Sequence, residues 1–147
     1  MVIKYKLLTQ QKSLRVLLEL DDDLVVNADY QRVSEVLTNL FENAVKYTSK
    51  RAEIKVRASR QDEMCRVSVF NTCRPIDEKD LENLFISFYR GDASRQRDKE
   101  GYGLGLAIVK SILDMHGAQY GAQNIDDGVE FWFMLPIVQL DGPGGGG

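Results

Sequence analysis

Two asparagines and a lysine recur at helical spacing near the start of the chain. A helix is predicted over Asp29–Thr48, and Asn39, Asn43 and Lys46 fall on one side of it. Asparagine is a mediocre helix former because its amide competes for backbone hydrogen bonds, and a merely solvated face would favour Glu, Lys, Gln or Arg. The pattern therefore favours a polar helix face that meets a ligand. A solvated face stays open as the alternative, since helix propensity is a weak guide.

Three alternating glycines precede a second helical pattern. Gly101, Gly103 and Gly105 stand in the string EGYGLGLAIVK, directly before apolar residues at helical spacing. Each glycine costs roughly 1 kcal/mol against alanine inside a helix, so such a run makes sense where backbone must closely approach another group. Free N–H groups at a helix N-terminus attract phosphate. The spacing matches neither the dinucleotide fingerprint nor the P-loop, so the glycine run alone is a weak signal. Its combination with the Asn and Lys face of the earlier helix is a much stronger one.

The other side of the Asp29–Thr48 helix is expected to pack on a hydrophobic core. Asp29 is a plausible N-cap for this helix. On a helix of 3.6 residues per turn the apolar side chains gather on one side, which is typical of a helix packed on a core. These residues are Tyr30, Val33, Leu37, Leu40, Phe41 and Ala44.

Strand patterns surround the two helices. The predicted strands cover Leu14–Leu20, Glu53–Ser59, Met64–Asn71, Gln119–Asn124 and Val129–Leu135. The last two form a hairpin around Asp127-Gly128. A short helix is predicted over Asp77–Leu84, and its leucines are expected to join Phe85 and Phe88 in the core.

Composition excludes several classes of function. The 147 residues suit one domain with a real core, and a formal net charge of −3 argues against general binding to nucleic acid or to anionic membranes. One histidine and two cysteines, Cys65 and Cys73, make a structural zinc site improbable, and the cysteines are expected to be reduced thiols. No apolar run is long enough to span a bilayer.

The motifs, in their order and spacing, resemble the catalytic ATP-binding domain of sensor histidine kinases. NLFENAVKYT looks like the asparagine box, FISFYR (Phe85–Arg90) like the phenylalanine box, and EGYGLGLAIVKSILDMHG like the second glycine box and its helix. The resemblance covers Leu14–Pro136 and extends to the gyrase, heat-shock chaperone and mismatch-repair ATPases. It implies an α+β two-layer sandwich, in which helices cover one face of a mixed, mainly antiparallel sheet.

The resemblance also implies ATP and Mg²⁺ as ligands. Asn43 would coordinate Mg²⁺ together with the phosphates, with Asn39 assisting, while Lys46 would contact phosphate and Tyr47 would lie against the nucleotide. Positively charged residues between Tyr89 and Glu100, in the segment that forms the ATP lid in this family, are available to phosphate. The other nucleotide-contacting positions that carry over are Asn71, Ile76, Arg90, Gly101, Gly103, Leu104, Gly105 and Leu106.

One motif departs from the family pattern. The first glycine box is usually Asp-x-Gly-x-Gly-Ile, whereas the string NTCRPI places Asn71, Cys73 and Pro75 at its Asp and two Gly positions and keeps Ile76. An asparagine carbonyl can still accept a hydrogen bond from the adenine amino group, but it lacks the charge of a carboxylate. A degenerate nucleotide-binding pseudokinase is therefore one alternative function. A gyrase-type ATPase is another, although the water-activating Glu of that class aligns with Asn39.

The expected activity is transfer of the γ-phosphoryl group of ATP to a histidine on an upstream dimerisation domain absent from this chain. The only histidine, His116, resembles the family's helix end and not the phospho-acceptor, so no catalytic residue is assigned within the chain. Expected partners are the histidine-bearing dimerisation helices and a response regulator, in a homodimeric longer protein anchored to the membrane with this domain in the cytoplasm. The isolated domain is expected to be monomeric and inactive. Residues 1–13 are assigned to an N-terminal extension, 14–138 to the ATP-binding domain and 139–147 to a flexible tail.

Overall fold

A computed structural model describes residues 15–20, 24–47, 53–85 and 103–138. The predicted domain boundaries at residues 13 and 139 lie at or beyond the limits of the described residues. The predicted lid segment lies outside them. The elements in chain order are β1 (Arg15–Leu20), α2 (Tyr30–Tyr47), β2 (Glu53–Gln61), β3 (Met64–Thr72), α3 (Glu78–Leu81), α5 (Gly103–Met115), β4 (Tyr120–Ile125) and β5 (Gly128–Pro136).

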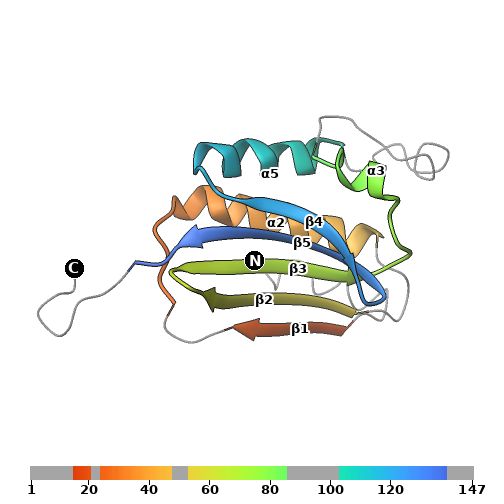
Figure 1. The fold of residues 1–147 in the computed structure, drawn as a ribbon, viewed down its shortest axis with the longest axis horizontal. Coiled ribbons are helices and arrows are strands. Elements are labelled where there is room, and N and C mark those ends of the chain that lie inside the picture. Colours follow the sequence, from red (N-terminus) through yellow and green to blue (C-terminus); the bar gives the residue numbers. More distant parts are fainter. Residues whose placement is uncertain (1–14, 21–23, 48–52, 86–102, 139–147) are drawn as a thin grey trace, which may run out of the picture.

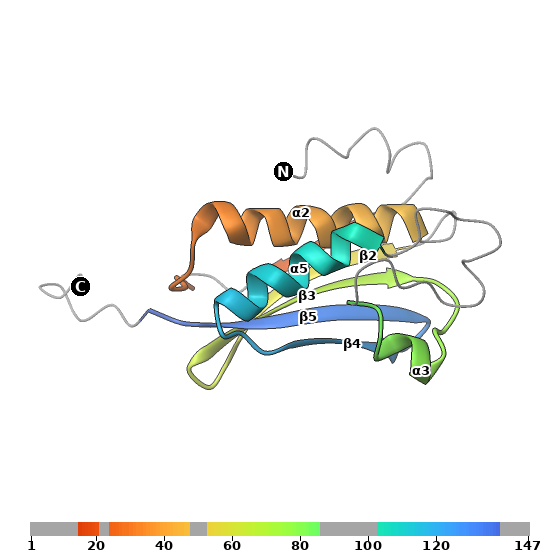
Figure 2. The same ribbon diagram turned by 90° about the horizontal axis from the view of Figure 1, so that it is seen from above.

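The five strands form one sheet in the order β1-β2-β3-β5-β4. β1 runs parallel to β2, and every other neighbouring pair is antiparallel. Helices α2 and α5 lie side by side over one face of this sheet (Figures 1 and 2). This arrangement confirms the predicted α+β sandwich with a mixed, mainly antiparallel sheet.

The core lies between the helices and the sheet. In α2 the buried residues include Leu40, Phe41 and Ala44, as predicted. Tyr30 was predicted to join them, but it is 83% exposed. Tyr30 is the first residue of α2, and helical periodicity indicates the side on which a residue lies without indicating whether another element covers it. The complete buried apolar cluster comprises Val36, Leu40, Phe41, Ala44, Val45, Ile54, Val69, Leu81, Leu84, Leu106, Val109, Ile112, Leu113, Val129, Phe131, Phe133 and Leu135.

The β4–β5 turn differs from the prediction by one residue. Asp126 takes the left-handed conformation at φ 51°, so the turn consists of Asp126 and Asp127, and Gly128 belongs to β5. The glycine is needed there for close approach of two strands and not for the turn. A Cβ atom at Gly128 would lie 2.1 Å from the backbone oxygen of Asn71 on β3.

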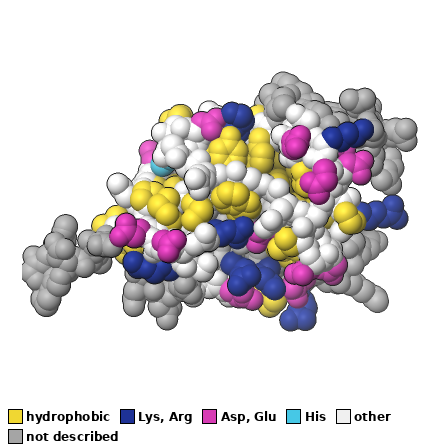
Figure 3. Space-filling view, viewed as in Figure 1, with side chains coloured by type: hydrophobic (Ala, Val, Ile, Leu, Met, Phe, Trp, Pro, Cys, Tyr) yellow, Lys and Arg dark blue, Asp and Glu magenta, His cyan; other side chains and the backbone are white. Residues whose placement is uncertain are grey.

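The face of the sheet away from the helices carries charged side chains. In the orientation of Figure 3, basic and acidic side chains lie below and around the hydrophobic side chains in the middle of the molecule. Arg57 pairs with Glu19 at 2.9 Å, and Arg66 pairs with Glu130 at 2.7 Å. Glu130 lies on the face away from the helices, and it is nevertheless only 4% exposed.

The end of α5 is closed by the pair His116-Gly117. Gly117 has φ 63°, which is the left-handed conformation of a helix C-cap. Asp29 caps the start of α2, since its Oδ1 accepts a hydrogen bond from the backbone N–H of Arg32 at 3.2 Å. No helix in the described part of the chain is long and apolar enough to cross a membrane.

Candidate functional site

Four structural elements meet at one end of the molecule. Figures 1 and 2 show that the C-terminal end of α2, the N-terminal end of α5, the end of β3 and the short helix α3 lie together there. Arg90 and Gly101 lie outside the described residues, and only the backbone of Gly103 and Leu104 is described. The predicted residues that these elements bring to this region are Asn39, Asn43, Lys46, Tyr47, Asn71, Ile76, Gly105 and Leu106.

Asn39 presents its oxygen to the start of α5. Its amide nitrogen donates to the backbone oxygen of Glu35 at 2.9 Å, one turn earlier in the same helix. The amide is therefore oriented, and its Oδ1 would lie 3.6 Å from a Cβ atom placed at Gly105. A glycine at this position keeps the space in front of an oriented oxygen acceptor free.

Asn43, Lys46 and Tyr47 continue the same helix face toward its end. Asn43 is half-buried and lies one turn after Asn39. Lys46 is exposed and is the basic residue of the last turn, where it complements the negative end of the helix dipole. Its Nζ lies 5.6 Å from the centroid of the Tyr47 ring, within range of a cation–π interaction. This end of α2 thus offers amide groups, a cation and an aromatic ring.

Leu106 lies on α5 in an apolar environment, unlike the polar residues at the end of α2. Its side chain is 1% exposed and belongs to the apolar cluster between the helices and the sheet. The contact with nucleotide predicted for Leu106 stays a prediction, because the packing accounts for this leucine without a ligand.

Asn71 is a polar residue within an apolar row of the sheet. Across the strands it pairs with Ile54 on β2 and with Val129 on β5, and both partners are at most 1% exposed. Because side chains alternate along a strand, all three point to the helix-covered face. Asn71 itself is 3% exposed, so its amide lies between the sheet and the helices.

Cys73 lies directly beside Asn71. Burial is the largest influence on the Cys73 thiol and raises its pKa above the ordinary value, while the Asp127 charge adds a smaller increase. Hydrogen bonds from the Asn71 side chain and from the Val129 N–H act in the opposite direction and lower the pKa. The backbone N–H of Cys73 donates to the Asp127 oxygen at 3.1 Å. Cys73 is thereby attached to the start of β5, and both cysteines are free thiols, as predicted.

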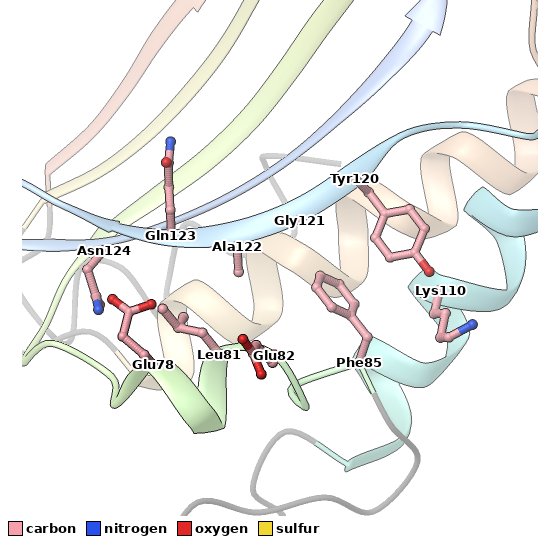
Figure 4. Close-up of a pocket in the computed structure, with 10 residues that line it drawn as sticks. All are labelled: Glu78, Leu81, Glu82, Phe85, Lys110, Tyr120, Gly121, Ala122, Gln123 and Asn124. Atoms are coloured by element: carbon pink, nitrogen blue, oxygen red, sulfur yellow. The ribbon is translucent and has the colours of Figure 1, made fainter.

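Ile76 is held by a residue that the sequence did not single out. The backbone N–H of Ile76 donates to Asn124 Oδ1 at 2.9 Å, and Asn124 Nδ2 donates back to the Ile76 oxygen at 2.8 Å. In Figure 4, Asn124 points from β4 toward the segment that leads into α3. This reciprocal pair secures the altered NTCRPI stretch to the edge of the sheet. Nothing in the local sequence around Asn124 indicates a contact 48 residues away.

A cavity of about 690 Å³ opens between α3, α5 and β4. Lys110 and Tyr120 lie on its polar rim, and both contact Asp114. Lys110 Nζ lies 2.6 Å from Asp114 Oδ2, and the Tyr120 hydroxyl donates to Asp114 Oδ1 at 3.0 Å. Of the sequence-predicted site residues that the structure describes, none lines this cavity. Its lining, shown in Figure 4, consists of Glu78, Leu81, Glu82, Phe85, Lys110, Tyr120, Gly121, Ala122, Gln123 and Asn124.

Known proteins share this sequence pattern and this fold. The family model described as "Histidine kinase-, DNA gyrase B-, and HSP90-like ATPase" matches residues 28–139. The chain is similar to sensor protein VanSB of Enterococcus faecalis, with 36% identity over 132 residues, which cover 90% of this chain and 30% of that protein.

Solved structures of kinase catalytic domains have the same fold. The nucleotide-free catalytic domain of histidine kinase ThkA is similar at a TM-score of 0.80 and 32% identity, covering 91% of this chain and 86% of that one. Histidine kinase ThkA in complex with the response regulator protein TrrA is similar at a TM-score of 0.76 and 30% identity, covering 92% of this chain and 38% of that one. The chain spans less than two fifths of the length of the curated relatives compared with it.

Proposed function

Because this chain belongs to the histidine kinase-, DNA gyrase B- and HSP90-like ATPase family, we propose that it is the catalytic, ATP-binding domain of a sensor histidine kinase. The observation that carries the proposal is the position of Gly105, at the start of α5, against the oriented Oδ1 of Asn39. A helix N-terminus with free N–H groups and an amide oxygen then face one space, which suits a phosphate chain and its metal ion.

Magnesium fits the donor set of this site. The described residues contain no group of three or more His, Cys, Asp or Glu side chains that could hold a metal. Mg²⁺ bound with a nucleotide keeps several waters and the phosphate oxygens as ligands, so it needs few protein ligands. Asn43 and Asn39 would supply amide oxygens, and the ion would neutralise phosphate charge. Lys46 would contact phosphate and Tyr47 the nucleotide.

The chain's own residues bind and orient the nucleotide, and the nucleophile comes from outside the chain. Phosphoryl transfer depends mostly on positioning and charge neutralisation. The acceptor would be a histidine on upstream dimerisation helices of a longer, homodimeric protein. A response regulator would then receive the phosphoryl group, and the complex of the similar kinase ThkA with the regulator TrrA supports this partner. We further propose that this domain lies in the cytoplasm of a membrane-anchored protein.

Calorimetric titration with ATP tests the proposal. We expect binding that depends on Mg²⁺, together with no sustained release of inorganic phosphate by the isolated chain, because Asn39 stands where the gyrase-type enzymes carry their Glu. Absence of ATP binding at millimolar concentration would overturn the proposed function and support the pseudokinase alternative. Steady ATP hydrolysis would instead support the gyrase-type alternative.

A further inference from the structure

β4 is an edge strand that lacks the usual protection of an open edge. The sheet order places β5 on one side of β4 and no strand of the described chain on the other. Native edge strands are commonly protected from pairing by charged side chains or by proline. The opposite edge strand, β1, carries Arg15 and Glu19, whereas β4 contains neither a charged residue nor proline. The open side of β4 is therefore suited to pairing with another strand.

The pairing of β4 with β5 determines which backbone groups face this open side. The N–H of Met134 on β5 donates to the Gln119 oxygen at 3.0 Å. In an antiparallel ladder only alternate residues exchange hydrogen bonds with the neighbouring strand. In the observed register Gly121 is therefore the next residue bonded to β5, while the N–H and C=O groups of Tyr120 and Ala122 point away from β5.

The cavity between α3, α5 and β4 runs along the same open side. Gly121 and Gln123 line it as well as Tyr120 and Ala122, although side chains alternate between the two faces of a strand. Gly121 has no side chain, so it contributes only backbone to the lining. Figure 4 shows the side chains of Gln123 and Ala122 pointing to opposite sides of β4. The cavity thus follows the edge of the strand and is not confined to one face of it.

The α3 side of this cavity combines apolar and acidic side chains. Leu81 and Phe85 supply apolar surface, and the ring of Phe85 lies 5.1 Å from that of Tyr120. Glu78 and Glu82 are exposed, and neither carboxylate is paired with a cation in the described part of the chain. In Figure 4, Glu78 lies toward the end of β4 and Phe85 toward its start. A segment bound along β4 would therefore meet negative charge and apolar surface in succession.

Charge complementarity indicates what this edge binds. The single cation in the cavity lining, Lys110, is already paired with Asp114 at 2.6 Å. Glu78 and Glu82 consequently leave net negative charge beside the edge, and the whole chain carries a formal net charge of −3. An extended segment presents residues i and i+2 to the same side. One basic side chain would meet the glutamates, and the next side chain on that side would pack on Phe85.

We propose that the open edge of β4 binds an extended segment of a partner protein by strand addition. This segment carries a basic residue and an apolar residue two positions apart. Main-chain hydrogen bonds to Tyr120 and Ala122 supply the pairing, and the side chains around the cavity supply the selectivity. The surface goes beyond the proposed nucleotide-binding function and does not depend on it, because the predicted nucleotide contacts that the structure describes do not line this cavity.

The test uses the full chain and a synthetic peptide, acetylated and amidated Val-Thr-Lys-Thr-Val. Its sequence reads the same in both directions, so lysine lies between two valines on one side for either strand orientation. Calorimetry measures the affinity, and the amide NMR signals of Tyr120 and Ala122 report the place of binding. We expect saturable binding that shifts both signals, and roughly tenfold weaker binding when glutamate replaces the lysine of the peptide.

Two modified peptides test the strand pairing on the wild-type protein. N-methylation removes the N–H donors of alternate residues, and only one of the two alternating sets faces β4 in a paired strand. Methylation of that set should abolish binding, and methylation of the other set should have a much smaller effect. Equal effects of the two modifications would overturn the proposal, as would no binding of the unmodified peptide at millimolar concentration.

Variants of the chain test both sides of the cavity. Ala122→Pro removes an N–H that faces the open edge, a position where edge strands accept proline, and should abolish binding, whereas Ala122→Ser should retain it. Glu78→Gln combined with Glu82→Gln should weaken binding roughly fivefold. Glu63→Gln, at the exposed β2–β3 turn, is the matched control and should bind as the wild type does.

The outcomes separate this inference from its alternatives. Full binding by a folded Ala122→Pro variant would overturn it, and the modified peptides decide the question if that variant does not fold. Self-association of the wild-type chain that Ala122→Pro removes would assign the edge to a second copy of this chain and would also overturn it. Peptide binding without ATP binding would count against the proposed function alone, and ATP binding without peptide binding would count against this inference alone.

Discussion

His116 Nε2 accepts a hydrogen bond from the backbone N–H of Asp29 at 3.2 Å. Its Nδ1 lies 2.9 Å from the Ile112 backbone oxygen, which can only accept, so Nδ1 is the donor in that contact. Nε2 thereby joins the end of α5 to the start of α2, while Nδ1 holds the ring against α5 itself. The lone pair that a phospho-accepting histidine would use for attack is already engaged, which gives this residue a structural role.

The first prediction follows for His116→Ala. We expect no phosphoryl transfer from ATP to the isolated chain, in the wild type or in the variant, when intact mass is followed with time. The variant should lose about 1 kcal/mol in free energy of unfolding, because the Asp29 N–H loses its acceptor. Urea denaturation measures this loss. A phosphorylated wild type whose label disappears in the variant would contradict the structural assignment.

The second prediction concerns the proposed metal ligand. Asn43→Ala should abolish the Mg²⁺-dependent, ATP-induced rise in melting temperature, since a ligand of the native state stabilises it in proportion to its binding. The melting temperature without ligand should change little, because Asn43 lies beside the buried stripe of α2 and not within it. Asn27→Ala is the matched control, because this exposed asparagine precedes α2 at the end of the helix opposite to Asn43. If the ATP effect survives in Asn43→Ala, Asn43 is not a metal ligand.

The third prediction tests the contact between α5 and α2. In Gly105→Ala the added methyl group would lie 3.6 Å from Asn39 Oδ1, an ordinary van der Waals distance, so the fold should accept it. Alanine could even stabilise the helix by up to about 1 kcal/mol. ATP affinity should nevertheless fall, because the methyl group occupies the space in front of the oxygen. Calorimetry and thermal melting on the same samples separate the two effects, and an unchanged affinity would exclude the proposed role of this space.

The sequence predicted the local elements of the site better than their long-range contacts. The limits of α2 and α5 follow from apolar periodicity and from the Asp29 cap, which are local properties. The pairing of Asn124 with Ile76 depends on the neighbouring order of β3, β5 and β4, which no local pattern encodes. Burial of Glu130 has the same origin, since its partner Arg66 comes from an adjacent strand. Tyr30 shows the converse limit, because its periodicity is that of a core residue and yet its side chain is 83% exposed.

The fourth prediction compares two glycines. In Gly128→Ala the new Cβ would lie 2.1 Å from the Asn71 backbone oxygen and 2.7 Å from the Phe70 ring, so β5 or β3 must shift. We expect a loss of about 3 kcal/mol in free energy of unfolding. In Gly117→Ala nothing lies within 4 Å of the new Cβ, and only the left-handed φ of 63° opposes it. That change should cost about 1 kcal/mol. Equal losses in the two variants would contradict the close approach at Gly128.

The fifth prediction concerns the acid sensitivity of the sheet. Burial is the largest influence on Glu130 and opposes its ionisation, but hydrogen bonds from Arg66, Gln123 and Ser68 and the positive charge of Arg66 together outweigh it and hold the pKa below the ordinary value of 4.5. A carboxylate whose pKa is lower in the folded state stabilises that state above its unfolded pKa. This stabilisation is lost as the pH falls through the folded pKa.

The measurement for Glu130 is urea denaturation between pH 7 and pH 3. Glu130→Gln should lose about 1–2 kcal/mol in free energy of unfolding at pH 7, and this difference from the wild type should shrink below about pH 4.5. Glu63→Gln, at an exposed position of the β2–β3 turn, is the control and should follow the wild-type profile. A difference that stays constant across the pH range would show that charge at Glu130 is not the cause.

The pairing of β3 with β5 has a consequence for how this fold can change over evolution. The two strands are neighbours along Met64–Thr72. The sheet itself therefore holds the two ends of the segment between Thr72 and Gly128 together. Within that segment, the ring of Phe85 lies 5.1 Å from that of Tyr120, and α5 begins at Gly103. The entropy of closing a loop between fixed ends grows slowly, by about 0.6 kcal/mol for each doubling of its length. A change in the number of residues between Thr72 and Gly128 therefore alters the entropic cost of closing this segment only slightly, while β3 and β5 keep their register.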